Sequence, residues 1–107
     1  MKYADYTYEA VELLKRLIAT PSVSREEAAA ADLLYDYAES CGLHCHRYGN
    51  NIWMMNEDEF SPLCPTILLN AHIDTVKPSA SWTRSPFVPQ VEGDRLFGLG
   101  SNDDGGG

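Results

Sequence analysis

The feature that most constrains the fold is a nearly continuous apolar run at residues 66–71, which ends directly before His72. A strand covered by helices on both faces has such a run, whereas a strand with one solvent-exposed face alternates apolar and polar residues. The run therefore predicts a buried strand of an α/β sheet. Ligand sites in open α/β sheets form at the carboxyl ends of the strands. We expect His72 and Asp74 to lie at such a site.

Two stretches with helical spacing of apolar residues precede this run. The first begins at Thr7, a residue type that favours the N-cap, and ends at Thr20 because the residue before a proline avoids the helical conformation. The second begins with Ser24 and Glu27 as a capping box and ends at Gly42, which suits the position just after a helix. These patterns predict two leading helices.

Short strands are predicted beside two glycine-containing turns. The expected strands cover residues 43–48, 52–56, 87–92 and 95–97, with turns at 49–51 and 93–94. Together with the buried run they would form a mixed sheet, and the predicted fold class is α/β.

Composition narrows the classes of function. The chain has 107 residues, enough for one domain, and a formal net charge of −8. This charge has the wrong sign for nucleic acid or an anionic membrane surface, so neither is an expected partner. The first residues lack the apolar core of a secretory signal, and three cysteines are too few for a disulfide scaffold. We therefore expect a cytoplasmic protein whose cysteines (Cys41, Cys45 and Cys64) are small buried thiols.

Two places along the chain carry side chains suited to metal chemistry. The nitrogen of His72 can bind zinc while the nearby carboxylate of Asp74 accepts the other ring N–H. Residues 98–105 form a glycine-rich stretch that contains two adjacent carboxylates, Asp103 and Asp104. Taken by itself, a His-x-Asp motif is more often a histidine hydrogen-bonded to a loop carbonyl, and a glycine-rich acidic stretch is more often a solvated turn.

A third cluster, Cys41, His44, Cys45 and His46, has the residue types of a zinc site. No second Cys/His pair follows at zinc-finger spacing. In a strand, Cys45 would point away from the two histidines. We interpret this cluster as a core thiol with surface histidines.

Taken in order, several motifs resemble those of the zinc amidohydrolase family that contains acetylornithine deacetylase, succinyl-diaminopimelate desuccinylase, carboxypeptidase G and aminoacylase. The matching segments are residues 20–24, 49–52, 68–76, 82–87 and 93–103. The resemblance covers nearly the whole chain. The amino-acid sequence of the last segment is most similar to the acetylornithine deacetylase type.

This resemblance implies that residues 1–107 are the N-terminal part of a zinc-peptidase-like α/β catalytic domain. His72 would bind one zinc ion, Asp74 would act in catalysis by orienting His72, and Asp103 would bridge two zinc ions. The Asp103–Asp104 peptide bond would be cis. The implied substrate is an N-acyl amino acid such as N-acetylornithine, and the full-length protein would be a homodimer with a separate dimerisation domain.

The family's glutamate base and its remaining metal ligands do not match any part of residues 1–107. Even a catalytic zinc ion keeps three protein ligands, so two cannot complete the site. We therefore expect this chain to be inactive by itself. The alternative hypothesis is a truncated, catalytically inactive remnant or interaction module.

Overall fold

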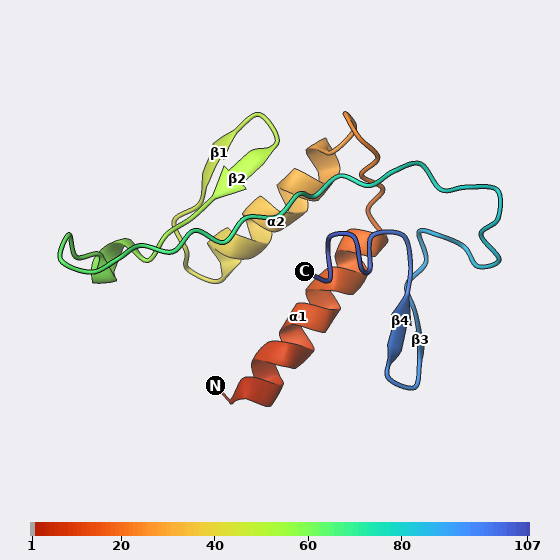
Figure 1. Cartoon of the computed structure of the whole chain (residues 1–107), viewed down its shortest axis with the longest axis horizontal. Coiled ribbons are helices and arrows are strands. Elements are labelled where there is room, and N and C mark those ends of the chain that lie inside the picture. The colour runs from red at the N-terminus through yellow and green to blue at the C-terminus, as the bar shows by residue number, and fades with distance from the viewer. Residues whose placement is uncertain (1) are drawn as a thin grey trace.

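The computed structural model describes residues 2–107. Two helices lead into two separate hairpins, which are joined by a long irregular segment (Figure 1). The elements are α1 (Tyr3–Ile18), α2 (Ala28–Ser40), β1 (His46–Tyr48), β2 (Asn51–Trp53), the short 3-10 helix η1 (Glu57–Glu59), β3 (Gln90–Glu92) and β4 (Arg95–Phe97). This content agrees with the predicted α/β class. Within residues 2–107, no helix is long and apolar enough to cross a membrane.

Helix α1 begins five residues earlier than the sequence predicted. Lys2 is its N-cap residue, and the Lys2 backbone N–H donates to the Asp5 carboxylate at 3.1 Å. The prediction of Thr7 as N-cap is therefore wrong, because Thr7 lies inside the helix with its hydroxyl donating to the Tyr3 carbonyl. The predicted end before Pro21 is confirmed, since the last helical residue is Ile18.

Helix α2 begins at Ala28 with Glu27 as N-cap, so the predicted capping box is also wrong. The Ser24 hydroxyl donates to the Asp74 carboxylate rather than to the helix. The Glu27 carboxylate accepts the Arg25 backbone N–H at 2.7 Å. A tertiary contact has taken the hydroxyl that local sequence reasoning assigned to a helix end.

The predicted end of α2 at Gly42 is confirmed. Gly42 has φ +80°, in the left-handed region that favours glycine. Its N–H donates to the Glu39 carbonyl at 3.0 Å, and the Leu43 N–H donates to the Ala38 carbonyl at 3.1 Å. These two bonds form a Schellman motif, which satisfies carbonyls at the helix end.

The four predicted short strands are present and pair as two hairpins; three are shorter than expected, and β4 has the predicted bounds. β1 pairs antiparallel with β2, and β3 pairs antiparallel with β4. Two-residue loops join the strands, with Gly49 at φ +61° and Gly93 at φ +60° in the first loop position. The ion pair between Arg47 and Asp32 ties the first hairpin to α2.

The predicted buried strand at residues 66–71 is not formed, and this prediction is wrong for the described chain. These residues have no regular secondary structure. Among residues 2–107, no backbone hydrogen bond of a loop, turn or helix cap involves them. Ile67, Leu68 and Leu69 are 83%, 84% and 89% exposed. The physical reason is that no described segment pairs with this stretch or covers either of its faces.

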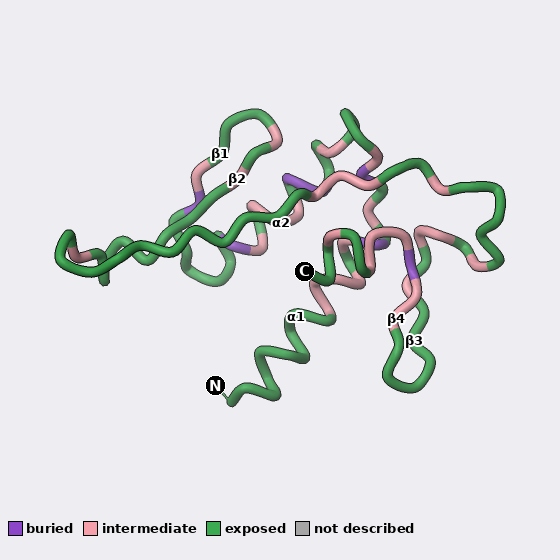
Figure 2. The backbone as a smooth tube through the Cα atoms, viewed as in Figure 1, coloured by how far each residue is buried: buried purple, intermediate pink, exposed green. Residues whose placement is uncertain are grey.

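The predicted mixed sheet is likewise replaced by two separate two-stranded sheets and one isolated parallel bridge between Val23 and Thr75. Figure 2 shows residues 62–72 as a continuously exposed stretch. The Cα radius of gyration is 15.4 Å, whereas a compact domain of this length has about 13 Å. The described chain is thus more extended than a compact domain. Its buried apolar residues are Ile18, Ala30, Ala31, Ala38 and Cys45.

The prediction that all three cysteines are buried holds only for Cys45, since Cys41 and Cys64 are exposed. Burial, with the nearby Glu39 carboxylate, raises the pKa of the Cys45 thiol. The Cys45 side chain is 4% exposed, at the point where the first hairpin meets α2.

We expect Cys45 to resist alkylation while the other two cysteines react. The attacking species is the thiolate, and a raised pKa keeps Cys45 protonated at a pH where exposed thiols have begun to ionise. Time-resolved iodoacetamide labelling at pH 8, read by peptide mass spectrometry, should show slow modification of Cys45, with a rate that rises toward higher pH. Equal labelling rates at all three positions would contradict the burial of Cys45.

Candidate metal centre

Two segments about fifty residues apart come together to form the base of the site. The Thr75 N–H donates to the Ser22 carbonyl at 2.8 Å, and the Ser24 N–H donates to the Thr75 carbonyl at 3.0 Å. The Ser22 hydroxyl donates to the Ile73 carbonyl at 2.9 Å. Ser22 is 7% exposed, so these bonds form in a largely dry part of the molecule. They fix the backbone of residues 72–75 against the segment that follows α1.

His72 is held from both ring nitrogens. Its Nδ1 lies 3.0 Å from the Asp74 carbonyl oxygen and 3.2 Å from Asp74 Oδ1, while its Nε2 lies 3.1 Å from Asp103 Oδ1. The structure therefore brings together all three predicted site residues. The hydrogen bond to the Asp74 carbonyl, followed by the Asp103 carboxylate, raises the pKa of His72.

The arrangement around His72 has an electrostatic consequence. A carbonyl oxygen can only accept a hydrogen bond, so the contact with Asp74 assigns a proton to Nδ1. A neutral ring then directs the lone pair of Nε2 at the carboxylate of Asp103. Two such acceptors at 3.1 Å repel each other unless a proton or a metal ion lies between them.

Asp74 uses its two carboxylate oxygens differently. Oδ1 faces His72, and Oδ2 accepts the hydrogen bond from the Ser24 hydroxyl. The bond from Ser24, together with His72, lowers the pKa of the Asp74 carboxyl. Asp74 is therefore held as a charged group beside the ring.

The glycine-rich stretch delivers Asp103 to His72. Gly100 has φ +86°, and a Cβ placed there would lie 3.0 Å from Thr75 Cγ2. The Leu99 N–H donates to the Pro86 carbonyl at 2.7 Å, which anchors the start of the turn. The predicted cis peptide bond between Asp103 and Asp104 is present. The solvated turn considered from the sequence is thus a loop packed against the His72 segment.

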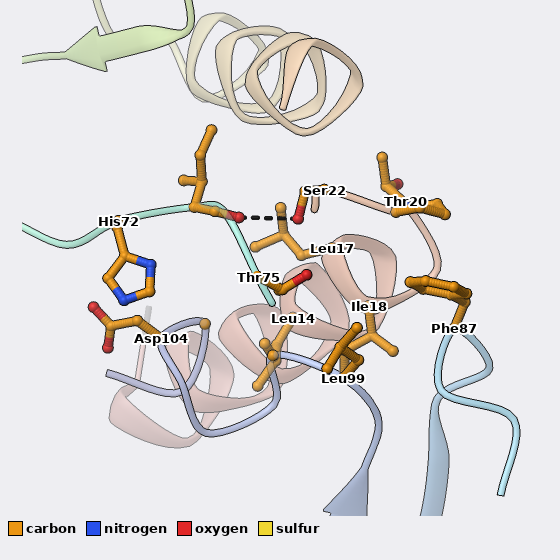
Figure 3. A pocket seen from close by; sticks show the side chains of 14 residues that line it. Leu14, Leu17, Ile18, Thr20, Ser22, His72, Thr75, Phe87, Leu99 and Asp104 are labelled. Atoms are coloured by element: carbon orange, nitrogen blue, oxygen red, sulfur yellow. Dashed lines mark hydrogen bonds between the residues drawn. The ribbon is translucent and has the colours of Figure 1, made fainter. Parts of the chain in front are cut away.

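A small apolar cavity of about 50 Å³ lies beneath the site (Figure 3). Leu14, Ile18 and Phe87 contribute to its wall, and His72 and Asp104 lie on the same side of it. An open groove of about 350 Å³ lies along the His72 and Asp103 side chains and is bordered by Trp82. The site therefore has an apolar floor and an accessible face.

The donor atoms fit zinc in type and in spacing. Zinc binds imidazole nitrogen and carboxylate oxygen, and two ligands of a tetrahedral zinc ion lie about 3.3 Å apart. The separation of His72 Nε2 and Asp103 Oδ1 is 3.1 Å. Within residues 2–107, no group of three or more His, Cys, Asp or Glu side chains is arranged to hold a metal ion. Among the described residues, the site thus brings together two side chains of the types that zinc binds, His72 and Asp103.

The Cys/His cluster is arranged as the sequence predicted, with a core thiol and outward histidines. His46 stacks on Trp53 with ring centroids 5.5 Å apart, and its Nε2 lies 3.2 Å from Glu57. His44 is exposed and meets the edge of His46. These contacts stabilise the first hairpin and lie outside the site.

Sequence reasoning missed Ser24, which it assigned to a helix cap. The signal that could have found it is the spacing of Ser22 and Ser24. In extended backbone, residues two apart point to the same side. Both hydroxyls donate to the 72–75 segment, one to Ile73 and the other to Asp74.

Comparison with known proteins agrees with the motifs. The chain is 31% identical over 102 residues to a succinyl-diaminopimelate desuccinylase of Rhizorhabdus wittichii, covering 87% of this chain and 26% of that protein. It is 35% identical over 101 residues to the desuccinylase of Alkalilimnicola ehrlichii, covering 89% and 26%. A desuccinylase of Erythrobacter litoralis is 30% identical over 107 residues, covering 89% and 28%. No family model matches the chain.

These similarities support the amidohydrolase family that the motifs indicated. The relatives are named for desuccinylation, and the acetylornithine deacetylase type in particular is not confirmed. The chain spans about a quarter of the length of the curated relatives it matches.

Proposed function

We propose that this chain is the N-terminal part of a zinc-dependent amidohydrolase that removes an acyl group from an N-acyl amino acid. The observation that carries the proposal is the approach of His72 Nε2 to the Asp103 carboxylate, with Nδ1 bound to Asp74. Two acceptors in that position are stabilised by a shared cation. The names of the relatives add support for amide hydrolysis.

The chain's own residues have distinct roles in this proposal. His72 and Asp103 would hold zinc, and Asp74 would fix the ring so that Nε2 is free to bind. Zinc in such sites supplies a bound water of lowered pKa and polarises a carbonyl oxygen. The groove bordered by Trp82 leaves the metal-facing side open to substrate. The general base and further ligands would come from parts of the protein beyond residues 1–107.

For the substrate, we propose an N-succinyl amino acid such as N-succinyl-diaminopimelate. The names of the relatives support the succinyl group. N-acetylornithine, the substrate that the sequence resemblance implied, has no such support and becomes the comparison substrate. The enzyme would work as a homodimer.

The proposal is tested in two steps. The intact mass of the protein from its native source is measured first, and we expect a value well above the 11.9 kDa of this chain. The purified protein is then assayed with N-succinyl-diaminopimelate and N-acetylornithine, with and without zinc. Zinc-dependent cleavage of the succinyl substrate supports the proposal, and preference for N-acetylornithine overturns the substrate assignment.

A native mass of 11.9 kDa with no hydrolysis of either substrate would favour the inactive remnant instead. The similarity to named hydrolases over 87–89% of the chain argues against that alternative. The acidic charge of −8 also gives no support to a nucleic-acid-binding module.

A further inference from the structure

The Ser24 hydroxyl makes a hydrogen bond that no helix-capping role explains. It donates to Asp74 Oδ2, fifty residues away in the sequence. The other oxygen of the same carboxylate, Oδ1, lies 3.2 Å from His72 Nδ1. Ser24 and His72 therefore hold the two oxygens of a single carboxylate.

The backbone around Ser24 is fixed in the position that this bond requires. The Ser24 N–H donates to the Thr75 carbonyl at 3.0 Å, beside the parallel bridge between Val23 and Thr75. The next residue, Arg25, is the one non-glycine residue with positive φ among residues 2–107, at +73°. A side chain at such a φ is unfavourable and persists where surrounding contacts impose it. The turn thus directs the Ser24 hydroxyl at Asp74 at some local cost.

We propose that Ser24 is a positioning residue for the metal centre, acting on His72 through Asp74. This inference rests on the proposed function. A carboxylate or carbonyl that accepts the N–H of a metal-binding histidine fixes the orientation and tautomer of the ring. With Oδ2 bound to Ser24, the carboxylate plane is set and Oδ1 stays beside Nδ1. Without the hydroxyl, the carboxylate of Asp74 can rotate, and the ring loses one of its restraints.

The closing experiment compares two variants that differ in a single functional group. Ser24→Thr keeps a hydroxyl, and Ser24→Val has nearly the same shape without one. Both are made in the full-length enzyme, and zinc affinity is measured by competition with a chromophoric chelator. Ser40→Ala serves as the control, because the Ser40 hydroxyl donates to the Tyr37 carbonyl at the end of α2 and lies outside the site. Thermal unfolding of each metal-free variant is recorded in parallel.

We expect Ser24→Val to weaken zinc binding about tenfold, the lower end of the usual effect of losing a hydrogen bond behind a metal ligand. Ser24→Thr, which keeps the hydroxyl, should bind zinc about as tightly as the wild type. The unfolding midpoints of these two variants should match each other. Ser40→Ala should leave zinc affinity close to that of the wild type.

Equal zinc affinity of Ser24→Val and Ser24→Thr, in an enzyme that binds zinc, would overturn the role of Ser24 and leave the proposed function intact. A loss of affinity in Ser24→Val that is matched by an equal loss in Ser40→Ala would also overturn it, because the effect would then not depend on the bond to Asp74. A wild-type enzyme that binds no zinc would overturn the proposed function itself.

Discussion

Under the proposed function, alanine in place of His72 is expected to abolish amide hydrolysis by the full-length protein, with a loss of at least about 100-fold. The ring contributes the nitrogen that faces Asp103, and no other histidine of residues 2–107 lies within hydrogen-bonding distance of that carboxylate. Zinc content should fall as well. The measurements are turnover of N-succinyl-diaminopimelate and metal analysis after dialysis.

The matched control for this variant is His44→Ala. His44 is also an exposed histidine, but its ring meets the edge of His46, outside the site. Because the His72 side chain is 52% exposed, its replacement should leave the unfolding midpoint nearly unchanged. Unchanged turnover in His72→Ala, or an equal loss in His44→Ala, would refute the assignment of the site.

Alanine in place of Gly98 is expected to lower the free energy of unfolding by about 1–3 kcal/mol, the usual effect of adding a methyl group to a packed interior. Gly98 is buried, and a Cβ placed there would lie 2.5 Å from Ile18 Cγ2 and 3.0 Å from Ile18 Cδ1. Ile18 is itself 2% exposed, so it has little room to move. Urea denaturation of the full-length protein measures the effect.

A double-mutant cycle tests whether Ile18 causes that loss. Ile18→Ala removes the atoms that the new methyl group would meet, so Gly98→Ala should cost much less in that background. The same penalty in both backgrounds would place the strain elsewhere. Gly93→Ala is a further control, because Gly93 has φ +60° and no atom within 4 Å of a Cβ placed there. Its loss reports the cost of an alanine at φ +60° without a steric contact, whereas Gly98 has φ +159°.

The sequence predicted well those elements whose signals are local. The Schellman motif at Gly42 and the hairpin turns at Gly49 and Gly93 depend on glycine at positive φ, and they lie where the sequence indicated. The helix starts were less predictable. Ser24 has the residue type of an N-cap, but a carboxylate fifty residues away accepts its hydrogen bond instead.

The buried strand at residues 66–71 could not be judged from its own residues. An apolar run shows what a segment would bury and not which segments are present to cover it. The grouping of the site residues was easier to predict. The motifs indicated His72, Asp74 and Asp103 together, and in the structure the His72 ring lies within 3.2 Å of the Asp74 carboxylate and 3.1 Å of the Asp103 carboxylate.

The hydrogen bonds that build the metal centre join residues 31 and 50 positions apart in the chain. Closing loops of this length costs conformational entropy before any contact is gained, and contacts between distant residues slow folding. The two helices and the two hairpins are local and can form early. We therefore expect the candidate metal centre to be among the last parts of this chain to become ordered during folding, after the helices and hairpins have formed.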